Sequence, residues 1–107
     1  MWNIPSITRL SKIPRLGETD KIETLEKKIF LHFFMGGSDW YVAEFDGEDT
    51  FFGYVILNSD TDNAEWGYFP FLELQHLKKG FLEVDCERAT YFKPRKVKDI
   101  PGITKTL

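Results

Sequence analysis

Paired carboxylates are the residues of this 107-residue chain whose type and spacing most directly suggest chemistry. Glu44, Asp46 and Glu65 lie in or beside predicted strands. Glycoside hydrolysis needs two carboxyl groups about 5–9 Å apart across a sugar-sized cleft. A chain this short, with tight turns, has few loops from which to build such a cleft. We therefore expect these carboxylates to face solvent or a partner, and a small hydrolase is the third hypothesis.

A second set of acidic residues has part of the spacing of a calcium loop. Asn58, Asp60 and Asp62 match the first, third and fifth ligand positions. The sixth position should be glycine and is Asn63, and the twelfth should be glutamate and is Phe69. Asp and Asn are also ordinary turn residues. The sequence therefore favours solvated turn residues over a metal site, with weak Mg²⁺ or Ca²⁺ binding as the alternative, and it predicts no cofactor.

Candidate nucleophiles and bases are few. The only histidines are His32 and His76, and the only cysteine is Cys86. His32 lies in an apolar run and is typical of a hydrogen-bonded sheet residue rather than a base. No nucleophile elbow, HExxH motif or phosphate loop occurs, so we expect a protein without catalytic activity. One cysteine excludes an internal disulfide and a cysteine zinc site, which fits a reduced, cytoplasmic compartment.

Charge is strongly segregated along the chain. Residues 29–77 carry nine acidic and no basic side chains, although the net charge of the whole chain is only −3. Residues 78–107 carry eight basic and four acidic side chains. Phosphate binding needs Lys and Arg, so a nucleic-acid-associated module is the alternative hypothesis. Its candidate residues lie in the basic C-terminal segment: Lys93, Arg95, Lys96 and Lys98.

Protein binding is the function that the acidic stretch favours. Residues 39–69 combine nine aromatic rings with eight carboxylates. Acidic side chains can match a basic groove on a nucleic-acid enzyme, and aromatic rings are common interface anchors. The competing interpretation is that the rings are core and the acids only confer solubility. The partner-binding candidates are Trp40, Tyr41, Glu44, Asp46, Glu48, Asp49, Asp60, Asp62, Glu65, Trp66 and Tyr68.

Short strands and turns must position these residues. The alternation of β-forming residues and Gly or Asp turns predicts an antiparallel meander over 28–69. A helix over 70–79 follows, with Pro70 at its first position, Lys78 and Lys79 in its last turn, and Gly80 as its stop. Residues 81–85 alternate and predict a fifth strand. The meander strands are predicted at 28–34, 40–46, 50–58 and 64–69.

The two ends of the chain give weaker signals. Residues 5–12 predict a short helix, with Asn3 near its start and Pro14 as its stop. Residues 16–29 are either helical or a loop leading into the first strand. The segment 86–107 predicts a short helical turn and a loose end. We expect one domain over 1–107, divided into an N-terminal segment 1–27, a sheet and helix core 28–85 and the C-terminal segment 86–107.

The central strand leaves one question of packing open. In 51–57 both faces are apolar, and such a strand is usually covered on both sides. The 70–79 helix can cover one face. The N-terminal segment, the C-terminal segment or a partner must cover the other. No apolar run reaches the roughly 20 residues that span a bilayer, and the start has no secretory signal pattern.

The runs HFFMGGSDWYVAEFD, FFGYVILN and AEWGYF, followed by a helix and EVD, resemble the domain of unknown function 2958 family. The resemblance covers about residues 13–99. That family has Ser or Thr at the helix start, where this chain has Pro70. Its members are small bacterial proteins of plasmids, phages and integrative elements, and the resemblance implies no catalytic residue. It implies a mobile-element accessory protein.

Together these observations predict a single α+β domain with an antiparallel sheet of about five strands. The functional hypothesis is a small acidic protein without catalytic activity, encoded by a mobile element. It would bind and modulate or inhibit a host or defence protein, and an anti-CRISPR protein is one example. A homodimer formed through an exposed sheet face or edge strand is a further hypothesis.

Overall fold

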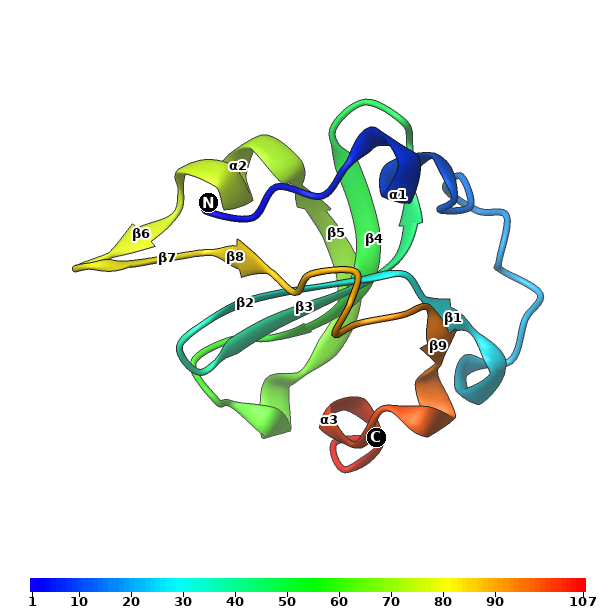
Figure 1. Ribbon diagram of the computed structural model, residues 1–107. Coiled ribbons are helices and arrows are strands. Elements are labelled where there is room, and N and C mark those ends of the chain that lie inside the picture. The colour runs from blue at the N-terminus through cyan, green and yellow to red at the C-terminus, as the bar shows by residue number, and fades with distance from the viewer.

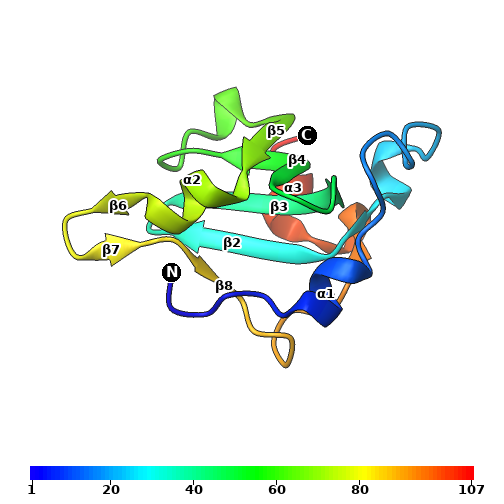
Figure 2. The same ribbon diagram turned by 90° about the horizontal axis from the view of Figure 1, so that it is seen from above.

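The central sheet is built from four consecutive strands joined by tight turns, with one more strand from later in the chain. The computed structural model describes residues 1–107. The five strands are antiparallel and follow the order β5-β4-β3-β2-β8 (Figures 1 and 2). The predicted α+β class with a five-stranded antiparallel sheet is confirmed. The strands are β2 Leu31–Met35, β3 Ser38–Phe45, β4 Thr50–Ile56, β5 Glu65–Pro70 and β8 Asp85–Cys86.

Several shorter elements surround the sheet. Two small ladders pair β1 with β9 and β6 with β7. No helix has the length and the apolar character that crossing a bilayer requires. The remaining elements are α1 Ile7–Ser11, η1 Thr24–Glu26, β1 Lys28–Ile29, η2 Thr61–Asn63, α2 Phe71–His76, β6 Lys78–Lys79, β7 Leu82–Glu83, β9 Arg95–Lys96, η3 Val97–Asp99 and α3 Pro101–Thr104.

Glycine turns set the register of the meander. Gly36, with φ of 56°, and Gly37 connect β2 to β3, so that Met35 pairs with Ser38. A side chain at Gly36 would strain this left-handed backbone. The register of β3 against β4 shifts between Val42 and Glu44, which marks a β-bulge. The bulge changes which side chains of β3 face each core.

One face of the sheet is covered by α2 and the N-terminal segment. Phe33, Trp40 and Phe51 form its centre, and Phe71 and Leu74 of α2 pack on them. Figure 1 shows α1 and α2 on the same side of the strands, with α3 on the opposite side. The predicted role of the helix as cover for one face is therefore correct.

The C-terminal segment covers part of the other face. Val97, Ile100 and Ile103 are buried there against Tyr41 and Tyr54. The prediction of a loose C-terminal end is therefore wrong. Apolar residues at positions 97, 100 and 103 form the second core, which answers the question that the central strand raised.

The helix after β5 is shorter than the predicted 70–79. Pro70 is the last residue of β5 rather than the first of the helix, and α2 ends at His76. Lys78 and Lys79 form β6, in which Lys78 pairs with Glu83 of β7. The Glu83 carboxylate itself binds the N-terminal ammonium group of Met1 at 2.5 Å, so Lys78 is held by the strand pairing and neither lysine lies in the last turn of the helix.

The predicted strand over 81–85 is two separate strands. Gly80, with φ of 63°, makes the turn between β6 and β7 instead of ending a helix. Phe81 at this turn is fully exposed, whereas Val84 is fully buried between β7 and β8. Because β8 alone joins the main sheet, the β6–β7 hairpin projects from the molecule in both ribbon views (Figures 1 and 2).

The N-terminal segment differs from the prediction in its cap. The Oγ of Ser6, not Asn3, accepts the Arg9 N–H at 3.2 Å at the start of α1. Asn3 instead donates to the Asp85 carboxylate from its backbone N–H at 2.7 Å and from Nδ2 at 2.9 Å. Residues 16–29 follow the loop alternative, with η1 as their only helical turn before β1.

Candidate functional site

Two of the predicted docking residues belong to the interior. Trp40 and Tyr41 are 4% and 7% exposed. They lie on opposite faces of β3, which has a strand on each side and a core on each face. Burial, with the charges of Asp39 and Glu87 nearby, raises the pKa of Tyr41 to about 12. The prediction that these two rings anchor a partner is therefore wrong.

Glu44 is a buried structural carboxylate, not a docking residue or half of a catalytic pair. It is 2% exposed and accepts hydrogen bonds from the N–H of Gly17 at 2.8 Å and of Thr19 at 3.0 Å. The Thr19 hydroxyl also donates to it. Burial disfavours the charged form, but these bonds outweigh it and hold the pKa of Glu44 below its ordinary value. Glu44 thus fastens the N-terminal loop to the sheet.

Two acids of the β3–β4 loop also have structural roles. Asp46 accepts the N–H groups of Glu48, Asp49 and Thr50 at 2.8–3.0 Å. The bond from the Glu48 N–H is the main reason that the pKa of Asp46 lies below its ordinary value. Asp49 accepts the Leu72 N–H at 2.7 Å and so caps α2,. Their charges stay near the surface, but their oxygens already hold the backbone.

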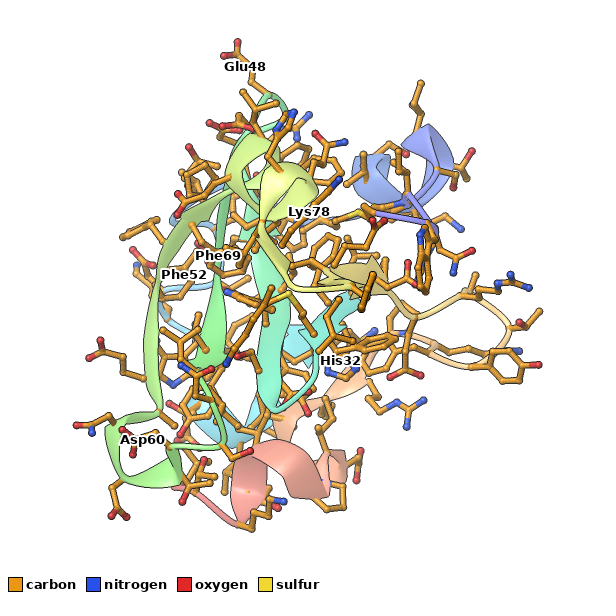
Figure 3. All side chains as sticks on the ribbon, turned by 90° about the vertical axis from the view of Figure 1, so that its left-hand side faces the viewer. His32, Glu48, Phe52, Asp60, Phe69 and Lys78 are labelled. Carbon is orange, nitrogen blue, oxygen red and sulfur yellow. The ribbon has the colours of Figure 1, made fainter.

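Five exposed acids lie along the β4–β5 side of the sheet. Glu48 lies at one end of this strand pair and Asp60 at the other, with Phe52 and Phe69 between them (Figure 3). The five are Glu48, Asp60, Asp62, Glu65 and Glu73.

Three rings form an aromatic strip on one face of β4 and β5. Phe52 pairs with Tyr68 across the strands, with ring centroids 5.0 Å apart, and stacks on Trp66 at 5.8 Å. Tyr68 is 69% exposed, and the other two are half-buried. We call Phe52, Trp66 and Tyr68 the aromatic strip. Of the two rings predicted as partner-binding candidates here, Tyr68 is exposed and Trp66 is half-buried against the second core; Phe52 was not among the predicted residues.

A groove of about 370 Å³ lies on the other face of the same strands. Its lining includes the apolar side chains of Trp40, Phe69 and Leu74, and two exposed acids, Glu65 and Glu73. Gly67 leaves the groove open, since a Cβ there would have no heavy atom within 4 Å. A smaller hollow that also contains Glu65 continues the groove towards Asp60. We call this feature the acidic groove; it was not predicted.

The register of β5 is the signal that could have revealed the groove. Gly67 lies directly opposite Gly53 of β4. The Tyr41 carbonyl fills the space beside Gly53, whereas nothing fills the space beside Gly67, so Gly67 alone leaves a gap in the side-chain layer,. The strip follows from the same register, because the alternating even residues share one face.

The basic C-terminal segment is partly neutralised within the molecule. Glu26 accepts hydrogen bonds from Lys96 Nζ at 2.6 Å and Lys98 Nζ at 3.1 Å. The bond from Lys96 is the main reason that the pKa of Glu26 lies below its ordinary value, and the bond from Lys98 adds to it. The same bond to Glu26 raises the pKa of Lys96 above its ordinary value. The Arg95 guanidinium lies 4.8 Å from the centre of the Phe92 ring. Of the four predicted residues, Lys96 and Lys98 form ion pairs, whereas Lys93 and Arg95 form none.

His32 is held between two carboxylates. Its Nδ1 lies 2.6 Å from Glu87 Oε1 and its Nε2 lies 2.7 Å from Asp39 Oδ1. The ring stacks on Tyr41 with centroids 4.4 Å apart. Both ring nitrogens are engaged, so neither is free to take a proton from a substrate in this arrangement.

Neither Cys86 nor the acidic loops form a reactive or metal-binding site. Burial raises the pKa of the Cys86 thiol to about 11, which disfavours the thiolate needed for nucleophilic attack. The 58–63 segment turns through η2, in which Asp60 accepts a hydrogen bond from Asn63. Nowhere do three His, Cys, Asp or Glu side chains gather as a metal ion would require.

Comparisons of the chain with models of protein families, with curated proteins and with solved structures found no match.

Proposed function

We propose that this chain is a binding protein without catalytic activity whose β4–β5 side docks a basic surface of another protein. The observation that carries the proposal is the meeting of exposed acids, an aromatic strip and an apolar groove around one strand, β5. The 49 residues 29–77, which include this strand, contain no Lys or Arg.

The two components of this surface have different roles in docking. Clustered carboxylates attract a basic partner over several ångströms and raise its rate of association. Exposed aromatic rings bury much apolar area with little loss of side-chain freedom, and such rings often dominate binding energy. The partner is a host or defence protein that handles nucleic acid, since such proteins present basic grooves. On the resemblance noted above, we also propose membership of the domain of unknown function 2958 family and an origin on a mobile element.

The residues on which a catalytic hypothesis would depend have other roles. Glu44 accepts three hydrogen bonds from the N-terminal loop. His32 bonds a carboxylate through each ring nitrogen. The hydrogen-bonding atoms of both side chains are therefore already engaged within the protein.

Charge reversal tests the proposal. We expect the tagged protein to capture a partner from a lysate of a bacterium that carries its gene, and the double variant Asp62→Lys/Glu65→Lys to lose it. The control, Asp20→Lys/Glu23→Lys, makes the same change of charge on exposed acids of the N-terminal loop and should retain the partner. Raising the salt concentration should weaken capture, because exposed charges are screened.

Two results would contradict the proposal. Equal recovery by the two double variants would show that acids at the β4–β5 side have no particular role. Binding of single-stranded DNA that falls steeply with salt and is lost in Lys93→Glu/Arg95→Glu would favour the nucleic-acid alternative instead.

A further inference from the structure

We propose that the partner binds by adding an extended basic segment to β5 as a sixth strand, with its cationic side chains in the acidic groove. This inference rests on the proposed function and names the part of the partner that is recognised. It follows from three features of β5: a free edge, a groove on one face and an aromatic strip on the other.

The hydrogen-bonding pattern leaves β5 with unpaired backbone groups. The Phe71 N–H donates to the Asp49 carbonyl at 2.7 Å, next to the β4–β5 ladder. Phe71 and Asp49 are therefore a hydrogen-bonded pair. Because hydrogen-bonded and non-hydrogen-bonded pairs alternate along an antiparallel ladder, residues 65, 67 and 69 also direct their backbone groups towards β4. Trp66 and Tyr68 therefore direct their N–H and C=O groups to the free edge, where a further strand can bond them.

Little at β5 prevents such pairing. Natural edge strands are usually short, bulged, covered or protected by Lys and Pro. The opposite edge, β8, has two residues, and Asn3 lies against it through two hydrogen bonds to Asp85. β5 has six residues in a regular register and carries only Pro70, at its end.

The acidic groove selects the side chains of the added strand. Alternate residues of that strand would lie on the groove face, beside Gly67 and between Glu65 and Glu73. A side chain with an apolar stem and a cationic end fits an apolar floor with two carboxylates, and Lys and Arg have this form. The hollow that continues past Glu65 towards Asp60 gives room for a second basic side chain two residues away.

The aromatic strip selects the intervening side chains. These would lie on the other face, next to Trp66 and Tyr68, where β-branched or aromatic neighbours pack well across strands. The recognised sequence is therefore an extended run in which basic residues alternate with β-branched or aromatic ones. Backbone bonds would supply affinity, and the two faces would supply specificity.

A second copy of this chain fits the same edge less well. If two β5 strands paired through the backbone groups of Trp66 and Tyr68, Gly67 would lie opposite the Gly67 of the second copy. The acidic groove would remain empty. The pairing would also bring Glu65 and Glu73 of both copies to one interface without a basic side chain from 29–77 to balance them.

Peptides of defined sequence test the inference directly. The probe is a terminally blocked nine-residue peptide that alternates Lys with Val, and the control replaces each Lys with Glu. We expect the Lys peptide to slow amide hydrogen exchange at Trp66 and Tyr68 and to bind at least about tenfold more tightly than the Glu peptide. Unchanged exchange at both amides, or equal binding of the two peptides, would overturn the inference.

Two variants test the groove and the edge separately. Gly67→Val places a side chain in the groove at a position where a Cβ would have no heavy atom within 4 Å, and we expect about a tenfold loss of affinity for the Lys peptide. Tyr68→Pro removes an outward N–H, whereas Tyr68→Thr removes the ring and keeps the N–H, so the Pro variant should bind more weakly. Circular dichroism checks that each variant is folded. Undiminished binding by folded Gly67→Val would refute the groove as the binding site even if Tyr68→Pro did not fold.

The captured partner distinguishes this inference from the proposed function. If Asp62→Lys/Glu65→Lys loses the partner while Gly67→Val and Tyr68→Pro keep it, strand addition is wrong but acidic docking stands. If all these variants keep it, both are wrong. A wild-type dimer in sedimentation that Gly67→Val converts to monomers would overturn the inference in favour of a second copy.

Discussion

The two facing glycines of β4 and β5 give a sharp test of the sheet from which the docking surface was derived. Gly53 and Gly67 lie opposite each other, yet their surroundings differ. A Cβ at Gly53 would lie 1.9 Å from the Tyr41 carbonyl oxygen, whereas a Cβ at Gly67 would meet nothing within 4 Å. We predict that Gly53→Ala strongly destabilises the protein and that Gly67→Ala does not.

The size of the effect follows from the overlap. To relieve it, β3 and β4 would have to separate by about 1 Å, which weakens the ladder bonds around Tyr41, each worth about 1 kcal/mol. Overpacking itself costs about 1–3 kcal/mol. We therefore expect Gly53→Ala to lose about 3–5 kcal/mol of the free energy of unfolding. Gly67→Ala should gain about 0.5–1 kcal/mol, because alanine has less freedom than glycine in the unfolded chain.

Urea unfolding followed by tryptophan fluorescence and circular dichroism measures both changes. For a domain of this size, a loss of 3–5 kcal/mol corresponds to a fall in Tm of about 15–30 °C. If Gly53→Ala were within about 1 kcal/mol of the wild type, the register of β3 against β4 would be wrong. The assignment of outward backbone groups on β5 would then also fail, because it is built on β4.

Two further predictions concern the buried polar groups. Glu44→Gln should cost about 2–4 kcal/mol, since it weakens three bonds to a buried carboxylate. The pKa of Glu44 is lowered in the folded state from its ordinary 4.5. Its contribution to wild-type stability is therefore complete above that pH and is lost as the pH falls through the lowered value. Chemical unfolding in acid should show this loss in the wild type and not in Glu44→Gln, and an equal loss in both proteins would contradict the assignment. His32→Phe keeps an aromatic ring on Tyr41 but removes the ring nitrogens that Asp39 and Glu87 contact, so it should cost about 1–2 kcal/mol. Adding Asp39→Asn and Glu87→Gln should restore part of this lost stability. If His32→Phe left the free energy of unfolding unchanged, the carboxylates would not depend on the imidazole.

The meander could be predicted from the sequence because its signals are local. Each strand is a short run of β-forming residues, and Gly36, Gly37 and Gly47 lie in the turns between them. The position of 64–69 at the end of this meander matches its place as the edge strand β5.

Residues on the central strand were misjudged because their environment depends on distant segments. Trp40 and Tyr41 are buried because β2 and β4 flank them and because residues 71–74 and 97–103 cover the two faces. Glu44 binds Gly17 and Thr19, about 25 residues earlier. No periodicity within one strand carries that information.

The end of α2 was missed because two local signals compete. Lys78 and Lys79 suit the last turn of a helix, but they also suit a hairpin in which Lys78 faces Glu83. Gly80 is compatible both with the end of a helix and with the turn of a hairpin. The burial of Val84 and the pairing of β8 with the main sheet favour the hairpin.

The packing of the C-terminal segment on the second face has a consequence for biosynthesis. The residues that complete this core are Val97, Ile100 and Ile103, and Thr106 bonds the Tyr54 hydroxyl at 2.6 Å. During translation the strands emerge first, so the face of the sheet that carries the second core stays exposed to water until residues 97–106 have left the ribosome. An exposed aromatic sheet invites aggregation. A stalled or truncated nascent chain should therefore need a chaperone, whereas the finished chain closes its own second core.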